Sequence, residues 1–392
     1  MTLGYLVPEF PGQTHAFFWR EIGAIEDAGT PVRLYSTRHP PSGACPHDFA
    51  PQAIRRTTYL FPPRPAPAAR HILGHPLRVA RAIAYVAGLG ETSRKGKARL
   101  LALLPSAAML VADARRHGVS HLHIHSCADA AHLGALANIL GDLPYSLTLH
   151  GDLPVYGTDH RAKMKRARFV AAVTRPLAAQ VHAVSSATDS PVIWMGVDCD
   201  RFAPVPRPEN PVFTVATVAR LNHAKGHRFF LRAMADLRDR GIAIRYRIAG
   251  DGPERDAILA EIRELGLQDR VEMMGPLNEA AILELLQGAD ALALTSTGKG
   301  EAAPVTVMEA MACGLPVICS LIGGTPDMIR DGQDGFLVGQ EDVAAIVATV
   351  ARLVADPGLR RQIGKAARQS ALSGFDHRAN AQKLLDRIGS GT

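Results

Sequence analysis

Two glutamates separated by seven residues frame a predicted short helix in the last third of the chain. Glu301 lies in the loop before this helix, and Glu309 lies inside it, about two turns further on. Pro304 suits the first helical position, where its fixed φ fits and its missing N–H costs nothing. The helix continues without a breaker to Cys313, and Gly314 can adopt the left-handed conformation that ends a helix. The sequence therefore predicts a helix start between two carboxylates.

The start of this helix is a candidate anion site. The first N–H groups of a helix have no internal partners and carry the positive end of its dipole, so a phosphate binds there readily. The predicted phosphate-facing residues are Ala302, Ala303, Pro304 and Val305. The carboxylates on either side would accept hydrogen bonds from hydroxyl groups. A phosphate with hydroxyls on both sides describes a nucleotide sugar.

The sequence after the second glutamate carries a family resemblance. Ala310-Met311-Ala312-Cys313-Gly314-Leu315-Pro316-Val317, together with the glutamate pair, resembles the signature of the retaining glycosyltransferases of family GT4. The resemblance implies the α/β fold called GT-B, in which two Rossmann-like domains with parallel sheets face each other across a cleft. It also implies that Glu301 contacts hydroxyls of the donor sugar and that Glu309 binds the ribose. An ordinary Rossmann helix with a capping glutamate is the alternative.

Two cations follow a predicted strand over 212–219. The run Arg220-Leu221-Asn222-His223-Ala224-Lys225-Gly226 resembles the family's Gly-Arg-Leu-x-x-x-Lys-Gly, with Ala219 in place of the first glycine. The resemblance implies that Arg220 and Lys225 contact the donor diphosphate. Fixed cations beside a helix start would also stabilise the charge that builds on a departing nucleoside diphosphate. Exposed surface cations are the alternative.

Two further segments resemble donor-side parts of the family. The turn Gly250-Asp251-Gly252-Pro253 follows a predicted strand over 242–249 and resembles the family's Gly-x-Gly-Pro turn. By this resemblance, Gly250 and Gly252 give room near the nucleotide. The segment 275–277, which ends at Leu277, should pass the base through backbone contacts.

The chain opens with a predicted strand at Leu3–Val7, a turn that contains Gly12, and a helix from about Thr14, a plausible N-cap, to Ala28. One glycine is not a dinucleotide-binding fingerprint. The segment resembles the exopolysaccharide and colanic-acid branch of GT4 through Phe10, Pro11, Phe17 and Arg20-Glu21-Ile22. The resemblance implies that Gly12 lets backbone approach the diphosphate and that His15 faces the acceptor. A first-turn surface histidine is the alternative.

Histidines cluster near the middle of the N-terminal half. Strict alternation over 120–125 predicts a strand that brings His121, His123 and His125 to one face. A metal site is one interpretation, but a GT-B centre needs no metal, and a histidine-rich strand is common in the family at this position. His125, at the carboxyl end of the strand, is the one expected to border the cleft on the acceptor side.

Another predicted strand ends at His150. Ligands of open α/β sheets bind outside the carboxyl ends of the strands, where His150 lies. The segment 144–152 resembles the family's Phe-Thr-x-His-Gly-x-Asp, which implies that His150 contacts the donor sugar near the reacting carbon. Asp152 arrives one place earlier than the usual acid and is predicted to lie on the acceptor side.

Length and composition agree with a two-domain cytoplasmic protein. The 392 residues exceed one ordinary domain, and 47% apolar residues can build full cores. The net charge of +7 suits anionic partners such as nucleotides, nucleic acids or membranes. Of these, the resemblance selects a nucleotide and no nucleic acid. Five scattered cysteines read as reduced thiols. The N-terminus is too short and uncharged for a signal peptide, and the run 100–112 is too short to span a bilayer.

We expect four regions. They are an acceptor-side Rossmann-like domain at 1–195, a proline-rich hinge at 196–211, a nucleotide-sugar-binding domain at 212–372, and a C-terminal helix at 373–392 that crosses back to the first domain. The Pro-dense stretch 39–67 is expected to be a loop or extended cover and not a core element. A further strand is predicted at 191–194.

Two stretches of the N-terminal half are basic and predicted to be helical, 70–117 and 160–168. The first carries Arg78, Arg81, Arg94, Lys95, Lys97 and Arg99 among apolar residues at helical spacing. One interpretation is a surface that meets anionic lipid on the inner face of the plasma membrane, where lipid-linked acceptors reside. The other is a solvated basic face.

The sequence thus predicts a retaining hexosyltransferase-type enzyme. It would move a sugar from a UDP- or GDP-sugar to a hydroxyl of a lipid-linked or polysaccharide intermediate in exopolysaccharide or cell-surface glycan synthesis. No cofactor and no metal are expected beyond the nucleotide sugar as co-substrate. Two alternatives are a nucleotide-sugar 2-epimerase of GT-B fold and a non-catalytic nucleotide-sugar-binding partner.

Overall fold

The structure, a computed structural model, describes residues 1–298 and 302–390 of the chain. The contacts between residues divide it into two compact units. Unit 1 comprises Met1–Ile193 and the chain from Ala381 onward, and unit 2 comprises Trp194–Asn380. The predicted hinge segment 196–211 contains no helix or strand.

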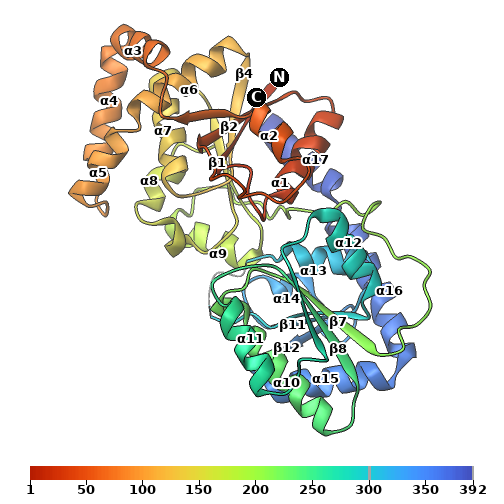
Figure 1. The fold of residues 1–392 in the computed structure, drawn as a ribbon. Coiled ribbons are helices and arrows are strands. Elements are labelled where there is room, and N and C mark those ends of the chain that lie inside the picture. Colours follow the sequence, from red (N-terminus) through yellow and green to blue (C-terminus); the bar gives the residue numbers. More distant parts are fainter. Residues whose placement is uncertain (299–301, 391–392) are drawn as a thin grey trace. The chain divides into compact units, whose positions relative to one another are not determined.

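Unit 1 is built on a parallel sheet with the order β3-β2-β1-β4-β5-β6 (Figure 1). Its strands are β1 (Thr2–Glu9), β2 (Val32–Arg38), β3 (Thr58–Phe61), β4 (Val119–Ile124), β5 (Tyr145–Leu149) and β6 (Val170–Ala172). This is the doubly wound order 3-2-1-4-5-6 of dinucleotide-binding folds. The order reverses between β1 and β4, so the loops after these two strands border the switch point, where such folds bind their ligands.

Helices cover both faces of this sheet. They are α1 (Ala16–Asp27), α2 (Ala50–Arg56), α3 (Pro65–Gly74), α4 (Pro76–Ala87), α5 (Arg94–Leu101), α6 (Leu104–Arg116), α7 (Asp129–Gly141), η1 (Leu153–Tyr156), α8 (His160–Met164), α9 (Arg175–Val184) and α17 (His377–Gly389). The boundary between the units falls inside α17. One apolar layer contains side chains of α1, α2 and α17, and the other contains side chains of α3 to α9.

Period-two alternation decides which side chains meet each layer. Leu3 and Tyr5 of β1 join the layer of α1 and α17, whereas Leu6 joins the opposite layer. On β4, Leu122 and Ile124 likewise face the layer of α3 to α9. Because successive side chains of a strand point to opposite faces, the histidines of β4 lie on the α1 face, among apolar groups.

Unit 2 repeats the architecture with the order β12-β11-β10-β7-β8-β9 (Figure 1). Its strands are β7 (Phe213–Val218), β8 (Ile244–Ala249), β9 (Val271–Gly275), β10 (Ala291–Leu294), β11 (Val317–Ser320) and β12 (Phe336–Val338). Its helices are η2 (His223–Lys225), α10 (His227–Asp239), α11 (Arg255–Glu264), α12 (Glu279–Gly288), α13 (Val305–Ala312), α14 (Thr325–Met328), α15 (Val343–Ala355) and α16 (Pro357–Gly374). Counted from β7, this is again the order 3-2-1-4-5-6, with its switch point between β7 and β10.

The prediction of a loop over 39–67 was wrong. The stretch contains α2 and the edge strand β3, and Leu60 of β3 is completely buried in the core. The strand is only four residues long and pairs on one side alone, with β2. A short edge strand tolerates proline on either side, so the proline density hid a core element.

Other predicted boundaries also differ. His15, not Thr14, is the N-cap of α1, because a turn from Gly12 to His15 precedes the helix. The predicted strand at 191–194 is a single bridge between Val192 and Ala172. The basic helix expected over 160–168 ends at Met164. Among the described residues, every helix falls short of the length and apolarity that a membrane span requires.

Candidate active site

In unit 2, the predicted donor-site cations follow β7, one of the two strands at the switch point. The loop after β10 lies beside the loop after β7. Thr295 Oγ1 donates to the Gly226 carbonyl at 3.0 Å, and Thr297 N donates to the Ala224 carbonyl at 2.8 Å. The chain that enters the glutamate-framed segment is therefore tied to the loop that carries Arg220 and Lys225.

Local capping fixes the position of Lys225. The Asn222 side chain accepts a hydrogen bond from Lys225 N at 3.2 Å, and Gly226 then starts α10 with φ +63°. A Cβ at Gly226 would lie 2.0 Å from the Thr295 carbonyl oxygen, so only glycine fits there. The side chain of Arg220 is exposed and that of Lys225 is half-buried. The turn presents two cations at the carboxyl edge of the sheet.

The predicted glycine turn after β8 packs against the same loop. A Cβ on Gly250 would lie 1.9 Å from the Ala219 carbonyl oxygen, and one on Gly252 would lie 2.3 Å from that of Leu221. Leu221 N in turn donates to the Asp251 carbonyl at 3.0 Å. These glycines therefore allow close backbone contact between two loops. Their predicted donor contact stays a prediction, as does that of Leu277, which lies half-buried after β9.

The helix of the glutamate signature is α13. It begins one residue later than predicted, because Pro304 is its N-cap, with an extended ψ of 114°. The preceding residues Ala302 and Ala303 are buried, and Val305, the first helical residue, is half-buried. Glu309 lies inside α13 and is 6% exposed. Glu301 lies outside the described residues, so its predicted contact with the sugar remains a prediction.

The end of α13 agrees with the prediction. Gly314 has φ +73°, its N–H donates to the Met311 carbonyl at 2.9 Å, and Leu315 N donates to the Ala310 carbonyl at 3.0 Å. This pair of bonds is the Schellman motif that ends a helix. Arg368 adds hydrogen bonds to the carbonyls of Ala312 and Phe202, both at 2.7 Å. The short helix is therefore fixed at its C-terminus.

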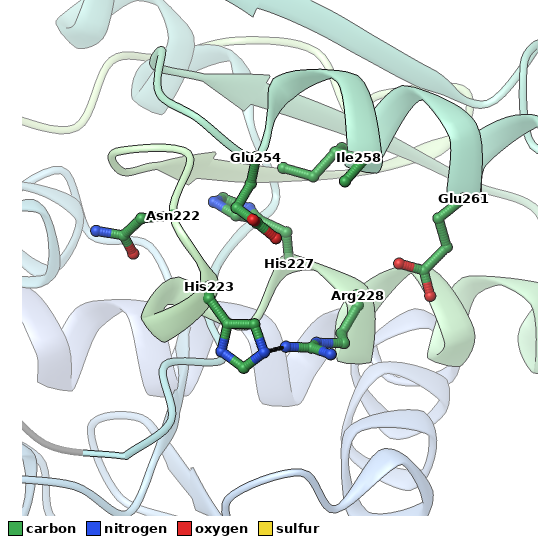
Figure 2. A pocket seen from close by; sticks show the side chains of 8 residues that line it. Asn222, His223, His227, Arg228, Glu254, Ile258 and Glu261 are labelled. Atoms are coloured by element: carbon green, nitrogen blue, oxygen red, sulfur yellow. Dashed lines mark hydrogen bonds between the residues drawn. The ribbon is translucent and has the colours of Figure 1, made fainter.

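A cavity of about 130 Å³ lies beside the loop that carries Arg220 and Lys225, here called the cation loop. Figure 2 shows Glu254, the N-cap of α11, and Glu261 of α11 on one side, and His223 and Arg228, which contact each other, on the other side. His227 is buried beneath this loop, with its Nε2 3.4 Å from the Arg220 carbonyl oxygen. Burial lowers the pKa of His227 to about 4. His227 is therefore a neutral support of the Arg220 backbone, which sequence reasoning missed.

In unit 1, the predicted histidine strand forms a ladder of hydrogen bonds with β5. His121 Nε2 lies 2.7 Å from Ser146 Oγ, which also lies 2.8 Å from His123 Nδ1. His123 Nε2 then meets Thr148 Oγ1 at 2.8 Å. Burial lowers the pKa of His121 to about 3 and that of His123 well below its usual value. Among the described residues, no group of three or more histidine, cysteine, aspartate or glutamate side chains is arranged to hold a metal.

The next pair of histidines follows β4, which borders the switch point, and its neighbour β5. His125 Nδ1 is 3.0 Å from His150 Nε2, and the two rings stack with centroids 5.3 Å apart. On its other side, His125 Nε2 lies 3.2 Å from Glu21 Oε1 of α1, which also accepts a hydrogen bond from Tyr5 at 2.8 Å. Burial, with His125 and His15 nearby, lowers the pKa of His150 well below 6.5. The structure thus brings two predicted residues into direct contact and places the Glu21 carboxylate on the far side of His125.

Sequence reasoning named Glu21 only as part of a family resemblance and gave it no role, and it missed Tyr5. A signal for Glu21 was present, because Phe18, Ile22 and Ile25 form the buried face of α1 and Glu21 falls on that face. A carboxylate on an apolar helix face needs a partner inside the protein. Tyr5 offered no such signal, because an inward tyrosine on a first strand reads as core.

The other predicted acceptor-side residues lie in loops at this edge of unit 1. The His15 ring stacks on Phe10 and packs close over Gly12, where a Cβ would lie 2.9 Å from two atoms of the ring. Burial first, and then His47, lower the pKa of His15 to about 4. Asp152 Oδ1 accepts a hydrogen bond from Gln180 at 2.7 Å, which ties its loop to α9. Their roles toward an acceptor stay predictions.

Two Rossmann-like units in one chain define the GT-B class of fold. The crystal structure of Anabaena HepE in complex with UDP matches with a TM-score of 0.70 and 18% identity, over 100% of both chains. This confirms the fold class that the sequence predicted.

Sequence comparison gives the family. Residues 201–370 match the glycosyl transferases group 1. The GDP-mannose-dependent alpha-(1-6)-phosphatidylinositol monomannoside mannosyltransferase of Mycolicibacterium smegmatis is 30% identical over 297 residues, which are 69% of this chain and 77% of that protein. A colanic acid biosynthesis glycosyltransferase named WcaL, from Escherichia coli K12, is 37% identical over 163 residues, only 40% of either chain. The chain belongs to the group 1 glycosyltransferases, a family of transferases of GT4 type.

Proposed function

We propose that this chain transfers a sugar from a UDP- or GDP-sugar to an acceptor hydroxyl, with retention at the anomeric carbon and without a metal. The observation that carries the proposal is the site at the switch point of unit 2. There Arg220 and Lys225 share one edge of the sheet with the start of α13, and Glu309 lies inside that helix. The similarity to a GDP-mannose-dependent enzyme and to a UDP complex supports these two donor classes.

The proposed reaction exchanges one bond at the anomeric carbon. The bond to the diphosphate oxygen breaks, and the acceptor oxygen bonds to the same face of the sugar. The acceptor proton passes to the departing phosphate oxygen, so the step needs no protein nucleophile. Arg220, Lys225 and the N–H groups at the start of α13 stabilise the charge on the diphosphate. Glu309 holds the ribose, and Glu301 and His150 orient the sugar.

A thermal-shift screen tests the donor site first. Purified protein is heated with UDP, GDP, ADP and their common sugars, each with and without EDTA. A ligand that binds only the folded state raises the Tm by mass action, by the equivalent of about 2.7 kcal/mol at a hundredfold excess over Kd. We expect one uracil or guanine nucleotide to raise the Tm equally in both conditions. A shift abolished by EDTA would reject the metal-free site, and no shift at all would favour a degenerate binding partner.

A product assay then separates transfer from isomerisation. The donor that binds is incubated with a membrane-lipid extract or with polysaccharide acceptors, and the sugar is followed by mass spectrometry. We expect nucleoside diphosphate release that depends on the acceptor and an α- or β-linkage that matches the donor. Conversion of the nucleotide sugar to its 2-epimer without any acceptor would instead support the epimerase alternative.

We further propose that α3 to α5 contact anionic membranes, where a lipid-linked acceptor of exopolysaccharide or cell-surface glycan synthesis would lie. Leu73 and Leu77 are 80% and 77% exposed, and Arg81, Arg94 and Lys95 are exposed on the same helices. The remaining predicted cations have partners inside the protein: Arg78 pairs with Asp142, Arg99 with Asp129, and Lys97 donates to the Ala87 carbonyl. Each of the three exposed cations (Arg81, Arg94 and Lys95) would contribute about 1 kcal/mol near an anionic surface.

Flotation with phosphatidylglycerol vesicles tests this surface. We expect binding at low salt that falls at 0.5 M salt, where charges are screened within a few ångströms. Leu77→Ser with Arg81→Ser should weaken it further. Leu321→Ser, which changes another exposed leucine, in unit 2 (53% exposed), is the control. No binding of the wild-type protein at low salt would remove the membrane proposal.

A further inference from the structure

The segment between β5 and α8, residues 150–159 and here called the His150 loop, begins at the proposed sugar-orienting residue. Glycine is the second residue of this loop, at Gly151, and occurs again at Gly157, which has φ +85°. Because glycine adopts many backbone conformations, the covalent chain alone does not fix a loop of this kind. Its hydrogen bonds therefore decide where His150 lies.

The first residue of the His150 loop is held by a phenol from the same loop. The Tyr156 hydroxyl accepts a hydrogen bond from His150 N at 3.0 Å. Tyr156 is half-buried at the end of η1, and burial raises its pKa to about 12, so the group is a neutral phenol at physiological pH. The bond fixes the backbone from which the His150 ring extends and uses neither nitrogen of that ring.

The backbone of Tyr156 is held in turn by a buried lysine of α8. Lys163 is 1% exposed, and its Nζ donates to the Tyr156 carbonyl at 3.0 Å and lies 3.5 Å from His160 Nδ1. Burial lowers the pKa of Lys163, because a cation removed from water is costly unless the protein supplies acceptors. The contact fixes the Tyr156 carbonyl, and with it the phenol that holds His150.

The far end of the His150 loop is clamped by Asp159, the N-cap of α8. An aspartate at this position usually accepts a hydrogen bond from its own helix. In the described part of the chain the Asp159 side chain makes no such bond, and its carboxylate instead accepts from the loop between α4 and α5. The donors are Gly90 N at 3.0 Å, Glu91 N at 3.2 Å, Thr92 N at 2.8 Å and Thr92 Oγ1 at 2.6 Å. The Glu91 carboxylate returns a bond, because it accepts from Asp159 N at 2.8 Å.

This clamp holds Asp159 in an unusual conformation. Its φ of +55° is left-handed, which few residues other than glycine, asparagine and aspartate tolerate. Burial opposes the charge of the carboxylate, but the hydrogen bonds from Thr92, Glu91 and Gly90 outweigh burial and lower the pKa of Asp159. The start of α8 therefore has a defined position, and so does Lys163, about one helical turn further along.

We propose that Tyr156, Lys163 and Asp159 are positioning residues that hold the His150 loop so that His150 meets the donor sugar. The ligand part of this inference rests on the proposed function, in which His150 orients that sugar. Asp159 fixes the start of α8, Lys163 of that helix fixes the Tyr156 carbonyl, and the Tyr156 hydroxyl fixes the backbone of His150. This positioning chain acts through His150 and not on the substrate.

Hydrogen exchange of the full chain, without nucleotide or acceptor, measures the positioning directly. Peptides that cover 150–157 and 88–93 are followed by mass spectrometry. We expect Tyr156→Phe to speed exchange of the His150 amide about tenfold, because this N–H loses its acceptor. Asp159→Ala should speed exchange in both peptides. Asp159→Asn keeps one oxygen and tolerates the left-handed conformation, so it should retain most of the protection. An unchanged His150 amide in Tyr156→Phe or in Asp159→Ala would overturn the proposal.

A double-mutant cycle on transfer tests whether the chain acts through His150. We expect Tyr156→Phe to lower kcat/KM about tenfold and to leave the rise in Tm given by the nucleotide unchanged. On the His150→Ala background, Tyr156→Phe should lower kcat/KM no further, because its effect is already lost. Additive losses would mean that Tyr156 acts elsewhere. A wild-type kcat/KM in Tyr156→Phe would mean that the phenol only stabilises the fold, and either result overturns the proposal.

Two matched variants control for lost stability. Tyr246→Phe removes a buried hydroxyl that donates to Thr217 Oγ1 at 2.8 Å in unit 2. It should lower the Tm and leave kcat/KM unchanged. Asp142→Asn changes another left-handed aspartate of unit 1, with φ +56°, which pairs with Arg78 at 2.6 Å. It should change neither the exchange of the His150 amide nor kcat/KM.

Further outcomes separate this inference from the proposed function. If Tyr156→Phe does not fold, Lys163→Met removes the bond to the Tyr156 carbonyl and carries the same expectations. The exchange experiment needs no substrate. Inactive wild-type protein in which Asp159→Ala still speeds exchange of the His150 amide would count against the proposed function and leave the positioning chain intact. Wild-type transfer by His150→Ala would overturn the role of the chain toward the sugar.

Discussion

The two sheets have the same strand order and put their switch points in equivalent places, yet they present opposite chemistry there. In unit 2 the loops after β7 and β10 carry Arg220, Lys225 and the approach to a helix start. In unit 1, His125 and His150 directly follow β4 and β5, their rings stack on each other, and burial lowers the pKa of His150 well below its usual value. The topology decides where a ligand can bind, and the side chains decide which part of the ligand each unit suits.

The difference continues below the surface. Unit 2 builds its loops from close backbone contacts that require glycine, as at Gly226 and Gly250. Unit 1 instead places a polar ladder, centred on Ser146 and His123, inside an otherwise apolar layer. A charged diphosphate needs fixed cations and backbone dipoles, whereas a neutral sugar needs oriented hydrogen bonds. This difference fits the proposed function, in which the cations of unit 2 face the donor diphosphate and His150 of unit 1 helps to orient the sugar.

Removing a cation of unit 2 should have the largest effect. We expect Lys225→Ala to lower kcat by about 10²–10³, as when one group that stabilises a developing anion is lost, and to reduce the Tm shift given by the nucleotide. His150→Ala in unit 1 should lower transfer but leave the nucleotide shift unchanged. Steady-state kinetics and thermal shifts on both variants check this division.

Arg232→Ala is the matched control for this test. Arg232 lies on α10, close in sequence to the cation loop, and pairs with Glu261 on the surface at 3.2 Å. Exposed pairs contribute about 0–1 kcal/mol, so its loss should leave transfer unchanged. A nucleotide shift that disappears in His150→Ala but survives in Lys225→Ala would reverse the assignment of the two units.

A methyl group at Gly250 should be the next most damaging change. In Gly250→Ala, the new Cβ would meet the Ala219 carbonyl at 1.9 Å, at a φ of +141° that side chains rarely adopt. We expect a loss of about 3 kcal/mol in the free energy of unfolding and weaker nucleotide binding, because the Arg220 loop must move. Urea unfolding measures the first effect. Gly288→Ala, where nothing lies within 4 Å of the added Cβ, should be neutral.

The fold and much of the site could be predicted from the sequence because several signals were local. Strand-and-helix alternation predicted the two parallel sheets, and proline and glycine around α13 marked its two ends to within one residue. The histidine alternation on β4 correctly predicted a shared face. These features depend on residues next to each other in the chain, which is where pattern reasoning is strongest.

The features that sequence reasoning missed depend on contacts between distant residues. Glu21 of α1 and His125 after β4 are far apart in sequence, and only the folded structure makes them neighbours. The role of Gly250 is likewise set by Ala219, which follows another strand, and β3 was hidden because its core residue Leu60 stands among prolines. Position along a chain does not reveal which partner a buried polar group will find.

On acidification, unit 1 should unfold at a higher pH than unit 2. Burial lowers the pKa of His121 to about 3 and of His132 to about 4 in unit 1, whereas unit 2 has His227 at about 4 among its described histidines. Below pH 6.5 these histidines bind protons in the unfolded chain but not in the folded one. Each one therefore removes about 1.4 kcal/mol of stability per pH unit, until its folded pKa is reached. Above pH 7 the loss is absent.

The chain has two tryptophans, Trp19 in unit 1 and Trp194 in unit 2, and their fluorescence can report which unit unfolds first. In single-tryptophan variants (Trp194→Phe or Trp19→Phe), the Trp19 fluorescence should change at a higher pH than that of Trp194. Coincident transitions would mean that the units unfold together, and an earlier Trp194 transition would contradict the argument from buried histidines.

The smallest expected effect tests whether the ladder and the His125–His150 pair are separable. Ser146→Ala leaves His121 Nε2 and His123 Nδ1 without their shared hydroxyl, which should cost about 1–3 kcal/mol of stability. Thr217→Val in unit 2 removes one hydroxyl that bonds Tyr246 and the Ala293 carbonyl, and should cost less. Among the described residues, the Ser146 hydroxyl bonds His121 and His123 and not His125 or His150, so urea unfolding should change while kcat/KM stays within about threefold of the wild type. A larger kinetic loss would mean that the ladder also positions the sugar.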